Sequence, residues 1–321
     1  MWIAELKEEM FSIRNLKSAF LTQKKWLLAL LLIALLLGTL YALMKDGPPM
    51  SDERQGGSPA SINAKAHRPL VMAHRGGAGL WPENTLYAFS RAVEMGVDVL
   101  EMDLHSTSDG ALVIIHDETV DRTTNGAGPV NRMTLDQLKK LDAAYQWSTD
   151  GRRSFPLRGQ GIGVPTLAEL FKAFPRMRFN IDIKQEQPSL IKPFCRLIRE
   201  SGMTGKVLVA SFDASVLDEF RRECAEVTTS ASAADVSRFL VIKTIEPVDT
   251  RTPAARVLQV PEYAGGQQVL TRELVLAAHR HHLEVHAWTI NDEAALRRII
   301  SLDVDGIITD YPDRLIALLD H

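Results

Sequence analysis

Apolar runs that read as strands alternate with amphipathic stretches that read as helices from Leu70 to the C-terminus. The alternation extends over roughly 250 residues, a length typical of one large domain built from repeated strand–helix units. This pattern predicts an α/β fold with a parallel sheet, and a (β/α)8 TIM-type barrel is our first expectation. A doubly wound open sheet would produce the same alternation and remains the alternative.

Ionisable residues follow the apolar runs of the first part of this region. Three runs end in this way: Leu70–Ala73 before His74, Val97–Leu100 before Glu101, and Leu112–Ile115 before His116. Such runs are typical of the buried strands of a parallel sheet. Because active sites of α/β proteins lie where such strands end, we expect these side chains to share one site.

Local signals predict where several helices begin and end. Asn84–Met95 reads as the first helix, and Gly96 is expected to cap its C-terminus. Thr166 opens a capping box at the start of a later helix, and Asn291 is expected to cap another. The region 226–265 contains only short apolar runs, and the order of elements within it stays open.

Acidic residues are spaced so that their side chains can meet. Glu101 and Asp103 are two positions apart on a predicted strand, so both side chains point to the same face, which in a barrel is the interior. Asp182 and Lys184 repeat this spacing on a later strand. Three carboxylates suit a hard divalent cation, Mg²⁺ or Ca²⁺. A surface strand edge is the alternative for the first pair, but the apolar residues before it argue against exposure.

Two histidines and two cations complete the candidate site. His74 and His116 form a candidate acid–base pair, because imidazole titrates near neutral pH. The Arg75 guanidinium offers paired donors to phosphate oxygens, and Lys184 offers a second cation, unless it serves in a structural ion pair. Trp288 is expected to line the mouth and contact the substrate, with a place in the barrel core as its alternative.

The motifs resemble, in order and spacing, those of the glycerophosphodiester phosphodiesterase family. The matching strings are His74-Arg75-Gly76, Pro82–Thr85, Glu101-Met102-Asp103, His116-Asp117, Arg122–Thr124, Asn180–Lys184, Trp288–Asn291 and Gly306–Asp310. The resemblance covers roughly residues 69–320 and implies a TIM-type barrel. It also implies metal ligands at Glu101, Asp103 and Asp182 and catalytic histidines at positions 74 and 116. Many members carry Glu where Asp182 stands, which leaves the preferred metal open.

The resemblance implies an enzyme that hydrolyses glycerophosphodiesters to glycerol 3-phosphate and an alcohol, with a divalent cation as cofactor. Attack by the glycerol 2-hydroxyl, followed by opening of a cyclic phosphate, is the implied route. A lysophospholipase D that acts on membrane lysophospholipids is the second possibility, and a non-catalytic barrel scaffold is a remote third. Residues 118–165 are too long for an ordinary βα loop. The resemblance implies that this insertion, which contains a predicted helix at Leu135–Leu141, caps the substrate cleft.

The N-terminal part reads as a membrane anchor and a tether. Residues 26–44 carry no charged side chain, and a helix of that length spans about 28 Å, enough to cross a hydrocarbon core. Lysines precede this run, so we expect residues 1–25 in the cytoplasm. Residues 45–69 read as a flexible linker to the barrel domain, residues 70–321. A cleavable signal peptide is the alternative, and a buried core helix fits poorly.

This topology predicts a single-pass membrane protein with its barrel on the periplasmic, extracellular or lumenal side. The net charge of −3 gives no basic excess, so nucleic acid is not an expected partner. The expected partners are a small diester or a lysophospholipid, and the membrane. Cys195 and Cys224 lie in predicted helices that can be neighbours. We expect two small buried apolar side chains there rather than a disulfide.

Overall fold

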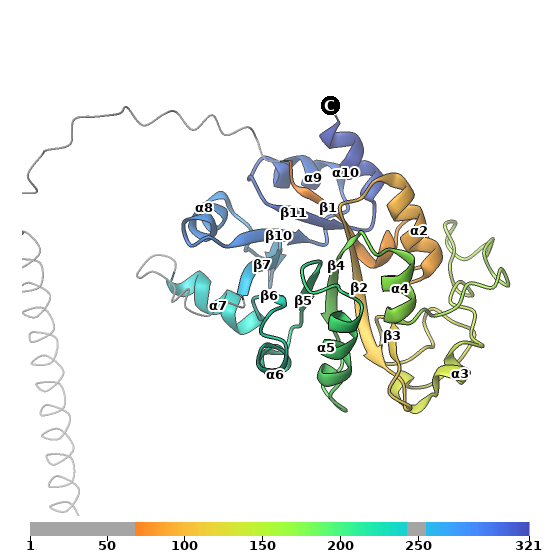
Figure 1. Cartoon of the computed structure of the whole chain (residues 1–321). Helices are drawn as coiled ribbons and strands as arrows, with labels where there is room; N and C mark the ends of the chain where they lie inside the picture. The colour runs from red at the N-terminus through yellow and green to blue at the C-terminus, as the bar shows by residue number, and fades with distance from the viewer. Residues whose placement is uncertain (1–67, 243–254, 321) are drawn as a thin grey trace, which may run out of the picture. The chain divides into compact units, whose positions relative to one another are not determined.

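The computed structural model describes residues 68–242 and 255–320 (Figure 1). These residues belong to one compact unit, Ala64–His321. The predicted cytoplasmic segment, the predicted anchor at 26–44 and all but the end of the predicted linker fall outside the described ranges. Within those ranges, no helix combines the length and the apolar character needed to cross a membrane.

Eight parallel strands close into a barrel, which confirms the first expectation and excludes the open sheet. Their order is β1-β11-β10-β7-β6-β5-β4-β2, and a further pairing between β1 and β2 closes the ring. The strands are β1 (Leu70–Ala73), β2 (Val99–Ser106), β4 (Arg178–Ile183), β5 (Val207–Ala210), β6 (Thr228–Ser230), β7 (Ala255–Pro261), β10 (Glu284–Trp288) and β11 (Gly306–Thr309).

Helices surround the strands (Figure 1). The α-helices are α2 (Leu86–Met95), α3 (Leu135–Leu138), α4 (Leu167–Ala173), α5 (Ile191–Glu200), α6 (Ala214–Glu223), α7 (Ala233–Ile242), α8 (Arg272–Arg280), α9 (Glu293–Ile300) and α10 (Pro312–Leu319). Two short 3-10 helices, η1 (His74–Gly76) and η2 (Val130–Arg132), and a small hairpin, β8 (Tyr263–Ala264) with β9 (Gln267–Gln268), complete the described elements. The described part of the region 226–265, whose order the sequence left open, holds β6, α7, β7 and β8.

The alternation of side chains along β2 separates a dry core from a polar interior. All eight residues of β2 are buried. Leu100, Met102 and Leu104 join the main hydrophobic core between barrel and helices. Glu101 and Asp103 point the other way and line the cavity at the barrel mouth. Because successive strand residues face opposite sides, the same strand builds both the core and the site.

Three predicted helix ends need correction. α2 begins at Leu86 rather than Asn84, because Asn84 has a left-handed backbone (φ 56°) and Thr85 caps the helix by accepting a hydrogen bond from the Ala88 N–H. α9 is capped by Asp292, not by Asn291. The helix expected at Leu135–Leu141 ends at Leu138. The predictions for Gly96 and Thr166 as caps are confirmed.

The insertion 118–165 is attached to an antiparallel strand. β3 (Leu112–Ile114) pairs antiparallel with β2, so the third apolar run is a strand but not a member of the parallel barrel. The insertion packs around a small core of its own, which includes Val120, Val130 and Leu138 together with Val113. None of the described residues that line the mouth cavity comes from 118–165. A capping role for the insertion therefore stays a prediction.

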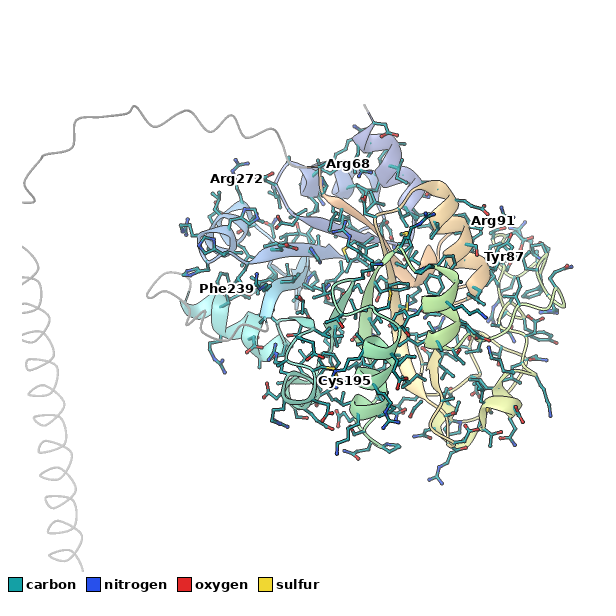
Figure 2. The ribbon with its side chains drawn as sticks, viewed as in Figure 1. Arg68, Tyr87, Arg91, Cys195, Phe239 and Arg272 are labelled. Atoms are coloured by element: carbon teal, nitrogen blue, oxygen red, sulfur yellow. A yellow bond between two sulfur atoms is a disulfide. The ribbon has the colours of Figure 1, made fainter. Side chains whose placement is uncertain are left out.

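The expectation for the two cysteines is wrong. Cys195 in α5 and Cys224 at the end of α6 form a disulfide across a Cα–Cα distance of 5.8 Å (Figure 2). Their helices follow the neighbouring strands β4 and β5 and pack against each other beside Phe194 and Phe220, whose ring centroids are 5.5 Å apart. Both sulfur-bearing side chains are fully buried. The sequence predicted that the two cysteines lie in helices that can be neighbours. It did not predict how these helices align, so it could not show that the cysteines face each other.

Candidate active site

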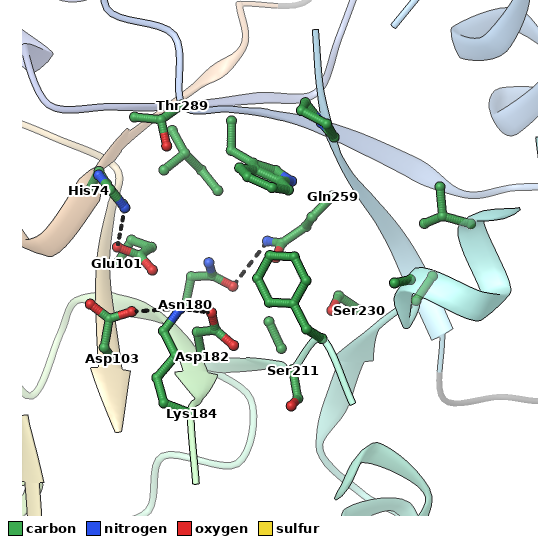
Figure 3. Close-up of a pocket in the computed structure, with 18 of the residues that line it drawn as sticks. His74, Glu101, Asp103, Asn180, Asp182, Lys184, Ser211, Ser230, Gln259 and Thr289 are labelled. Carbon is green, nitrogen blue, oxygen red and sulfur yellow. Dashed lines mark hydrogen bonds and ion pairs between the residues drawn. The ribbon is translucent and has the colours of Figure 1, made fainter. Parts of the chain in front are cut away.

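The predicted carboxylates lie side by side on β2 and β4. In the register of these strands Glu101 pairs with Asn180 and Asp103 with Asp182. All four side chains are buried and line one cavity of about 470 Å³ (Figure 3). The parallel pairing of β2 and β4 therefore brings together carboxylates that are far apart in sequence.

The cation that lies between two of these carboxylates is Lys184. Its Nζ is 2.5 Å from Asp182 Oδ2 and 3.2 Å from Asp103 Oδ1. Burial alone would raise the pKa of Asp103, but the neighbouring Lys184 and Arg75 charges outweigh it and lower that pKa. Burial raises the pKa of Asp182 despite the same ammonium. Lys184 therefore forms an ion pair at the centre of the site, which is the role that the sequence analysis gave as the alternative to phosphate binding.

Arg75 is held over the carboxylates by an unusual backbone. Its φ is 52°, a left-handed value that costs a non-glycine residue energy, and the two following glycines also have positive φ. In this turn the Arg75 backbone N–H donates to Glu101 Oε2 at 2.8 Å, and Arg75 Nε lies in an ion pair 3.2 Å from Asp103 Oδ2 without hydrogen-bond geometry. Burial raises the pKa of Glu101 to about 7.

His74 forms a dyad with a carboxylate from the last strand–helix loop. Its Nδ1 is 2.6 Å from Asp310 Oδ1, and Asp310 Oδ2 accepts a hydrogen bond from Asn291 Nδ2 at 2.6 Å. The other ring nitrogen, Nε2, is 4.0 Å from Glu101 Oε2. Burial would lower the pKa of His74, but Glu101 and Asp310 together raise it above 6.5. The Asp310 contact fixes which nitrogen faces the cavity.

His116 forms a second dyad of the same kind. Its Nδ1 is 2.6 Å from Oδ1 of the adjacent Asp117. Asp117 in turn accepts hydrogen bonds from Arg122 Nε (2.6 Å) and Nη2 (3.1 Å), and these bonds lower the pKa of Asp117 to about 2. His105 Nε2 lies 3.2 Å from the backbone oxygen of His116. The two predicted catalytic histidines line the same cavity, each bound to a carboxylate through Nδ1.

Arg122 and Glu83 connect the two sides of the site. Arg122 donates from Nη1 and Nη2 to Glu83 Oε2 and Oε1, both at 2.7 Å, while its other donors hold Asp117. Glu83 Oε1 also accepts a hydrogen bond from Arg75 Nη1 at 3.0 Å. The sequence motifs contain these residues, but spacing alone could not show that one guanidinium bridges two motifs. The same holds for Asn84, whose Nδ2 donates to Asp103 Oδ2 at 2.8 Å.

The chemistry of the carboxylates fits the expected divalent cation. Asp182 Oδ1 is buried and has no hydrogen-bond partner, so it is available as an oxygen ligand. Glu101 and Asp103 add two more buried carboxylates. In this structure the Lys184 ammonium lies between Asp103 and Asp182. In residues 68–242 and 255–320, no group of three or more His, Cys, Asp or Glu side chains is placed to hold a metal ion. Because Lys184 binds Asp182 through Oδ2, Oδ1 is the oxygen of Asp182 that remains for a cation.

Trp288 lies at the mouth, as predicted, at the end of β10. Its ring meets Phe212 edge to face at a centroid distance of 5.6 Å. Phe212 follows β5, and 60% of it is exposed. The sequence analysis missed this residue, because a lone aromatic between a strand and a helix carries no periodic signal. Trp288 also packs on Ile308 and its small cluster, so part of its surface serves the barrel core.

Comparison with known proteins gives a consistent match. The model of the glycerophosphoryl diester phosphodiesterase family matches residues 74–314. A glycerophosphodiester phosphodiesterase of Caldanaerobacter subterraneus is 34% identical over 257 residues, which cover 78% of this chain and 98% of that protein. A human lysophospholipase D is 26% identical over 273 residues, 76% of this chain and 84% of that protein.

Solved structures agree with the sequence comparisons. A phosphodiesterase of Oleispira antarctica, solved in complex with the product sn-glycerol-3-phosphate, superposes with a TM-score of 0.63 at 25% identity. The match covers 79% of this chain and 97% of that one. The family match includes both histidine dyads, the β2 and β4 carboxylates and Lys184. The chain therefore belongs to the glycerophosphoryl diester phosphodiesterase family.

Proposed function

We propose that this chain hydrolyses glycerophosphodiesters to glycerol 3-phosphate and an alcohol, with His74 and His116 as the acid–base pair. The observation that carries the proposal is the paired dyads: each imidazole binds a carboxylate through Nδ1 at 2.6 Å and lines the same cavity. Held in this way, each ring keeps Nε2 for proton transfer. One imidazole takes the proton of the attacking hydroxyl, and the other gives a proton to the departing alkoxide oxygen.

Charge on the phosphate is balanced by residues of the same cavity. The guanidinium of Arg75 and the ammonium of Lys184 are fixed donors next to the carboxylates. Donors that are already in place stabilise charge that develops on phosphate oxygens without further reorganisation. Glu83 and Asn84 hold Arg75 and Asp103 in position.

A divalent cation, Mg²⁺ or Ca²⁺, is part of this proposal. Glu101, Asp103 and Asp182 would hold it, because their oxygens are the ligands that hard cations prefer. When bound, the cation would polarise the phosphoryl group and neutralise its charge. The buried Asp182 Oδ1, which has no hydrogen-bond partner, supports this cation site.

The test measures glycerol 3-phosphate release from glycerophosphocholine by the wild type and by His74→Ala and His116→Ala. Each histidine substitution should reduce kcat by about 10²–10⁴-fold, the range of general acid–base catalysis, with an unchanged circular dichroism spectrum. Chelation should abolish turnover, and Mg²⁺ or Ca²⁺ should restore it and raise the melting temperature. Near-normal kcat in either histidine variant would refute its role, and full activity in chelator would refute the cation.

A lysophospholipase D activity is the second candidate. The observation in its favour is the uncharged wall of the cavity, where Phe212 and Trp288 lie, which can accept a hydrocarbon chain. The human relative carries that name as well. Turnover of glycerophosphocholine against lysophosphatidylcholine separates the two activities. A scaffold without activity is disfavoured, because both histidines and all three carboxylates are present and gathered.

We also propose that residues 26–44 anchor the protein in a membrane, with the barrel on the periplasmic, extracellular or lumenal side. The uncharged run and the lysines before it support this topology. The Cys195–Cys224 disulfide supports it independently. Disulfides persist in oxidising compartments and are rare in the cytosol.

A further inference from the structure

His116 is carried by a hairpin strand outside the ring of eight barrel strands. Among the predicted site residues it alone follows β3, a strand of three residues that pairs antiparallel with β2 (Figure 1). The other predicted site residues lie on barrel strands or directly after them. The position of the His116 imidazole relative to the cavity therefore depends on what joins this hairpin to the barrel.

The side-chain partners of His116 mostly belong to the same segment as His116 itself. Asp117, which holds Nδ1 at 2.6 Å, is the next residue of the same loop and moves with it. Arg122, which holds Asp117, follows five residues later, and its ion pair with Glu83 holds the segment from the solvent side, where 45% of the Arg122 side chain is exposed. The connection on the buried side comes from β2, the barrel strand that pairs with β3.

His105 of β2 provides this buried connection. The residue is 3% exposed, and its Nε2 lies 3.2 Å from the backbone oxygen of His116. Because a carbonyl oxygen can only accept, Nε2 carries the proton of the ring and donates this hydrogen bond. The backbone ladder between the two strands continues as far as the Ile115 N–H, which donates to the Asp103 oxygen at 3.1 Å. His105 therefore adds one side-chain bond just beyond the end of the ladder.

His105 acts on the site from outside the cavity. Glu101, Asp103 and His105 are two positions apart on β2, so their side chains leave the strand on the same face. The two carboxylates line the cavity, but His105 is not one of the described residues that do so. Its ring is instead bonded to the backbone of the hairpin. His105 can therefore affect the reaction only through the residue that it holds.

We propose that His105 is a positioning residue that fixes the place of the His116 imidazole relative to the cavity. The inference rests on the proposed function, because it concerns how one of the two proposed acid–base histidines is placed. The carbonyl that His105 holds and the imidazole of His116 belong to one residue, so a shift of one shifts the other. A misplacement of about 1 Å can cost on the order of 10²-fold in rate. Loss of the bond should therefore lower kcat, while Arg75 and Lys184 still bind the phosphate.

The first test compares the kinetics of His105→Leu, His105→Asn and His105→Gln on glycerophosphocholine. The glutamine amide is long enough to donate to the His116 oxygen, the asparagine amide is one methylene shorter, and leucine has no donor. We expect His105→Leu and His105→Asn to lower kcat by about 10- to 100-fold with KM close to the wild-type value. His105→Gln should recover most of the lost kcat.

The two amide variants keep this test decisive. If His105→Leu does not fold, the comparison of His105→Asn with His105→Gln still separates the loss of the bond from the loss of the ring. Wild-type kcat in His105→Asn, equal kcat in both amide variants, or a change confined to KM overturns the inference.

His286→Leu is the matched control. His286 is also 3% exposed, lies on β10 inside the barrel and is not one of the described residues that line the cavity. Its replacement should lower the unfolding free energy, as His105→Leu does, but leave kcat close to that of the wild type. An equal fall of kcat in both leucine variants would mean that the loss of any buried imidazole loosens the barrel, and it would overturn the inference.

Hydrogen exchange tests the placement of the hairpin without any substrate. Mass spectrometry compares wild type and His105→Asn in peptides that cover residues 112–117, on and after β3, and residues 178–183 of β4. We expect faster exchange at 112–117 and unchanged exchange at 178–183. Unchanged exchange at 112–117 overturns the inference even if kcat falls. If the wild type turns over no diester, the proposed function fails, and the exchange experiment still decides whether His105 holds the hairpin.

Discussion

At the scale of single residues, the site depends on partners that lie far away in the sequence. Asp310 is 236 positions from His74, yet it holds Nδ1 of that imidazole at 2.6 Å. The motifs were sufficient to predict that both histidines, the three carboxylates and Arg75 share one cavity, because each lies in or just after an apolar run. They were not sufficient to assign Asp310, Arg122 or Asn84, since each of these acts through a contact that only the closed barrel creates.

Arg122 is a positioning residue whose loss should affect both the His116–Asp117 dyad and Arg75. Arg122→Ala removes the donors that hold Asp117 and Glu83, so His116 and Arg75 lose their supports. We expect kcat for glycerophosphocholine to fall by about 10- to 100-fold, as for other residues that orient a catalytic group. Arg91→Ala is the control, because its side chain is 48% exposed against 45% for Arg122 and pairs with a carboxylate outside the site. Wild-type kcat in Arg122→Ala would contradict this role.

The same variant should change how stability depends on pH. Arg122 lowers the pKa of Asp117 from 3.8 to about 2 in the folded state. A lowered carboxyl pKa stabilises the fold above the unfolded value, and this stabilisation is lost as the pH falls from 3.8 towards 2. The difference in unfolding free energy between wild type and Arg122→Ala should therefore be present at pH 5–6 and small at pH 2. Chemical denaturation across this range measures it.

At the scale of elements, the sequence predicted where strands lie better than it predicted which strands pair and in which direction. The runs at Leu70–Ala73 and Gly306–Thr309 were found as strands, and both are. The run at Leu112–Ile115 has the same apolar composition, but β3 is antiparallel, because a short hairpin joins it to β2. The apolar composition of a run predicts that the strand is buried, but it does not predict whether the strand runs parallel or antiparallel to its neighbour. For the same reason the register that joins Cys195 to Cys224 was not visible.

Gly306 should be indispensable to the packing of β11. A Cβ at this position would lie 2.9 Å from Cδ2 of the buried His286 ring and 3.0 Å from Met72 Sδ. The His286 ring has little freedom to move, since its Nδ1 is 3.4 Å from the Gln259 amide inside the barrel. Gly306→Ala should lower the unfolding free energy by about 1–3 kcal/mol, the usual cost of overpacking.

Gly205→Ala is the matched control for that substitution. A Cβ at Gly205 would have no heavy atom within 4 Å, and its backbone is not left-handed. We expect a change within about 0.5 kcal/mol, as for other surface positions. Urea denaturation of both variants makes the comparison. Equal stabilities would show that the barrel interior relaxes around the added methyl group.

The disulfide should contribute strongly to stability. It closes a loop across a separation of 29 residues, for which the chain-entropy relation gives about 3–4 kcal/mol. Replacing both cysteines by alanine, or reducing the wild type, should lower the unfolding free energy by that amount. The check on the premise is a thiol titration of denatured, unreduced protein. Two reactive thiols per chain would mean that the bond does not form.

At the scale of the whole molecule, the alternation of elements predicted an α/β fold with a barrel as the first expectation, and the resemblance favoured the barrel and added the reaction. The closing pair, β1 with β2, could not be deduced from the alternation, which an open sheet shares. The predicted membrane segment lies outside the described residues, so only experiment addresses it.

The anchored topology predicts the outcome of fractionation. If the uncharged segment 26–44 spans the hydrocarbon core as proposed, alkaline carbonate should leave the full-length protein in the membrane pellet. A variant that begins at residue 46 should be recovered in the supernatant. Protease added to intact cells or vesicles should reach the barrel from the side opposite the cytoplasm. Release of the full-length protein by carbonate would defeat the anchor.

The seam of the barrel has a consequence for the timing of folding. β1 is the first strand of the described chain to be synthesised, and it pairs with β11, the last. Until β11 has emerged, β1 and β10 therefore each keep one unpaired edge. A chain arrested before Gly306 would expose these two edges to other chains. Ribosome-stalled intermediates should accordingly become protease-resistant in one late step rather than gradually.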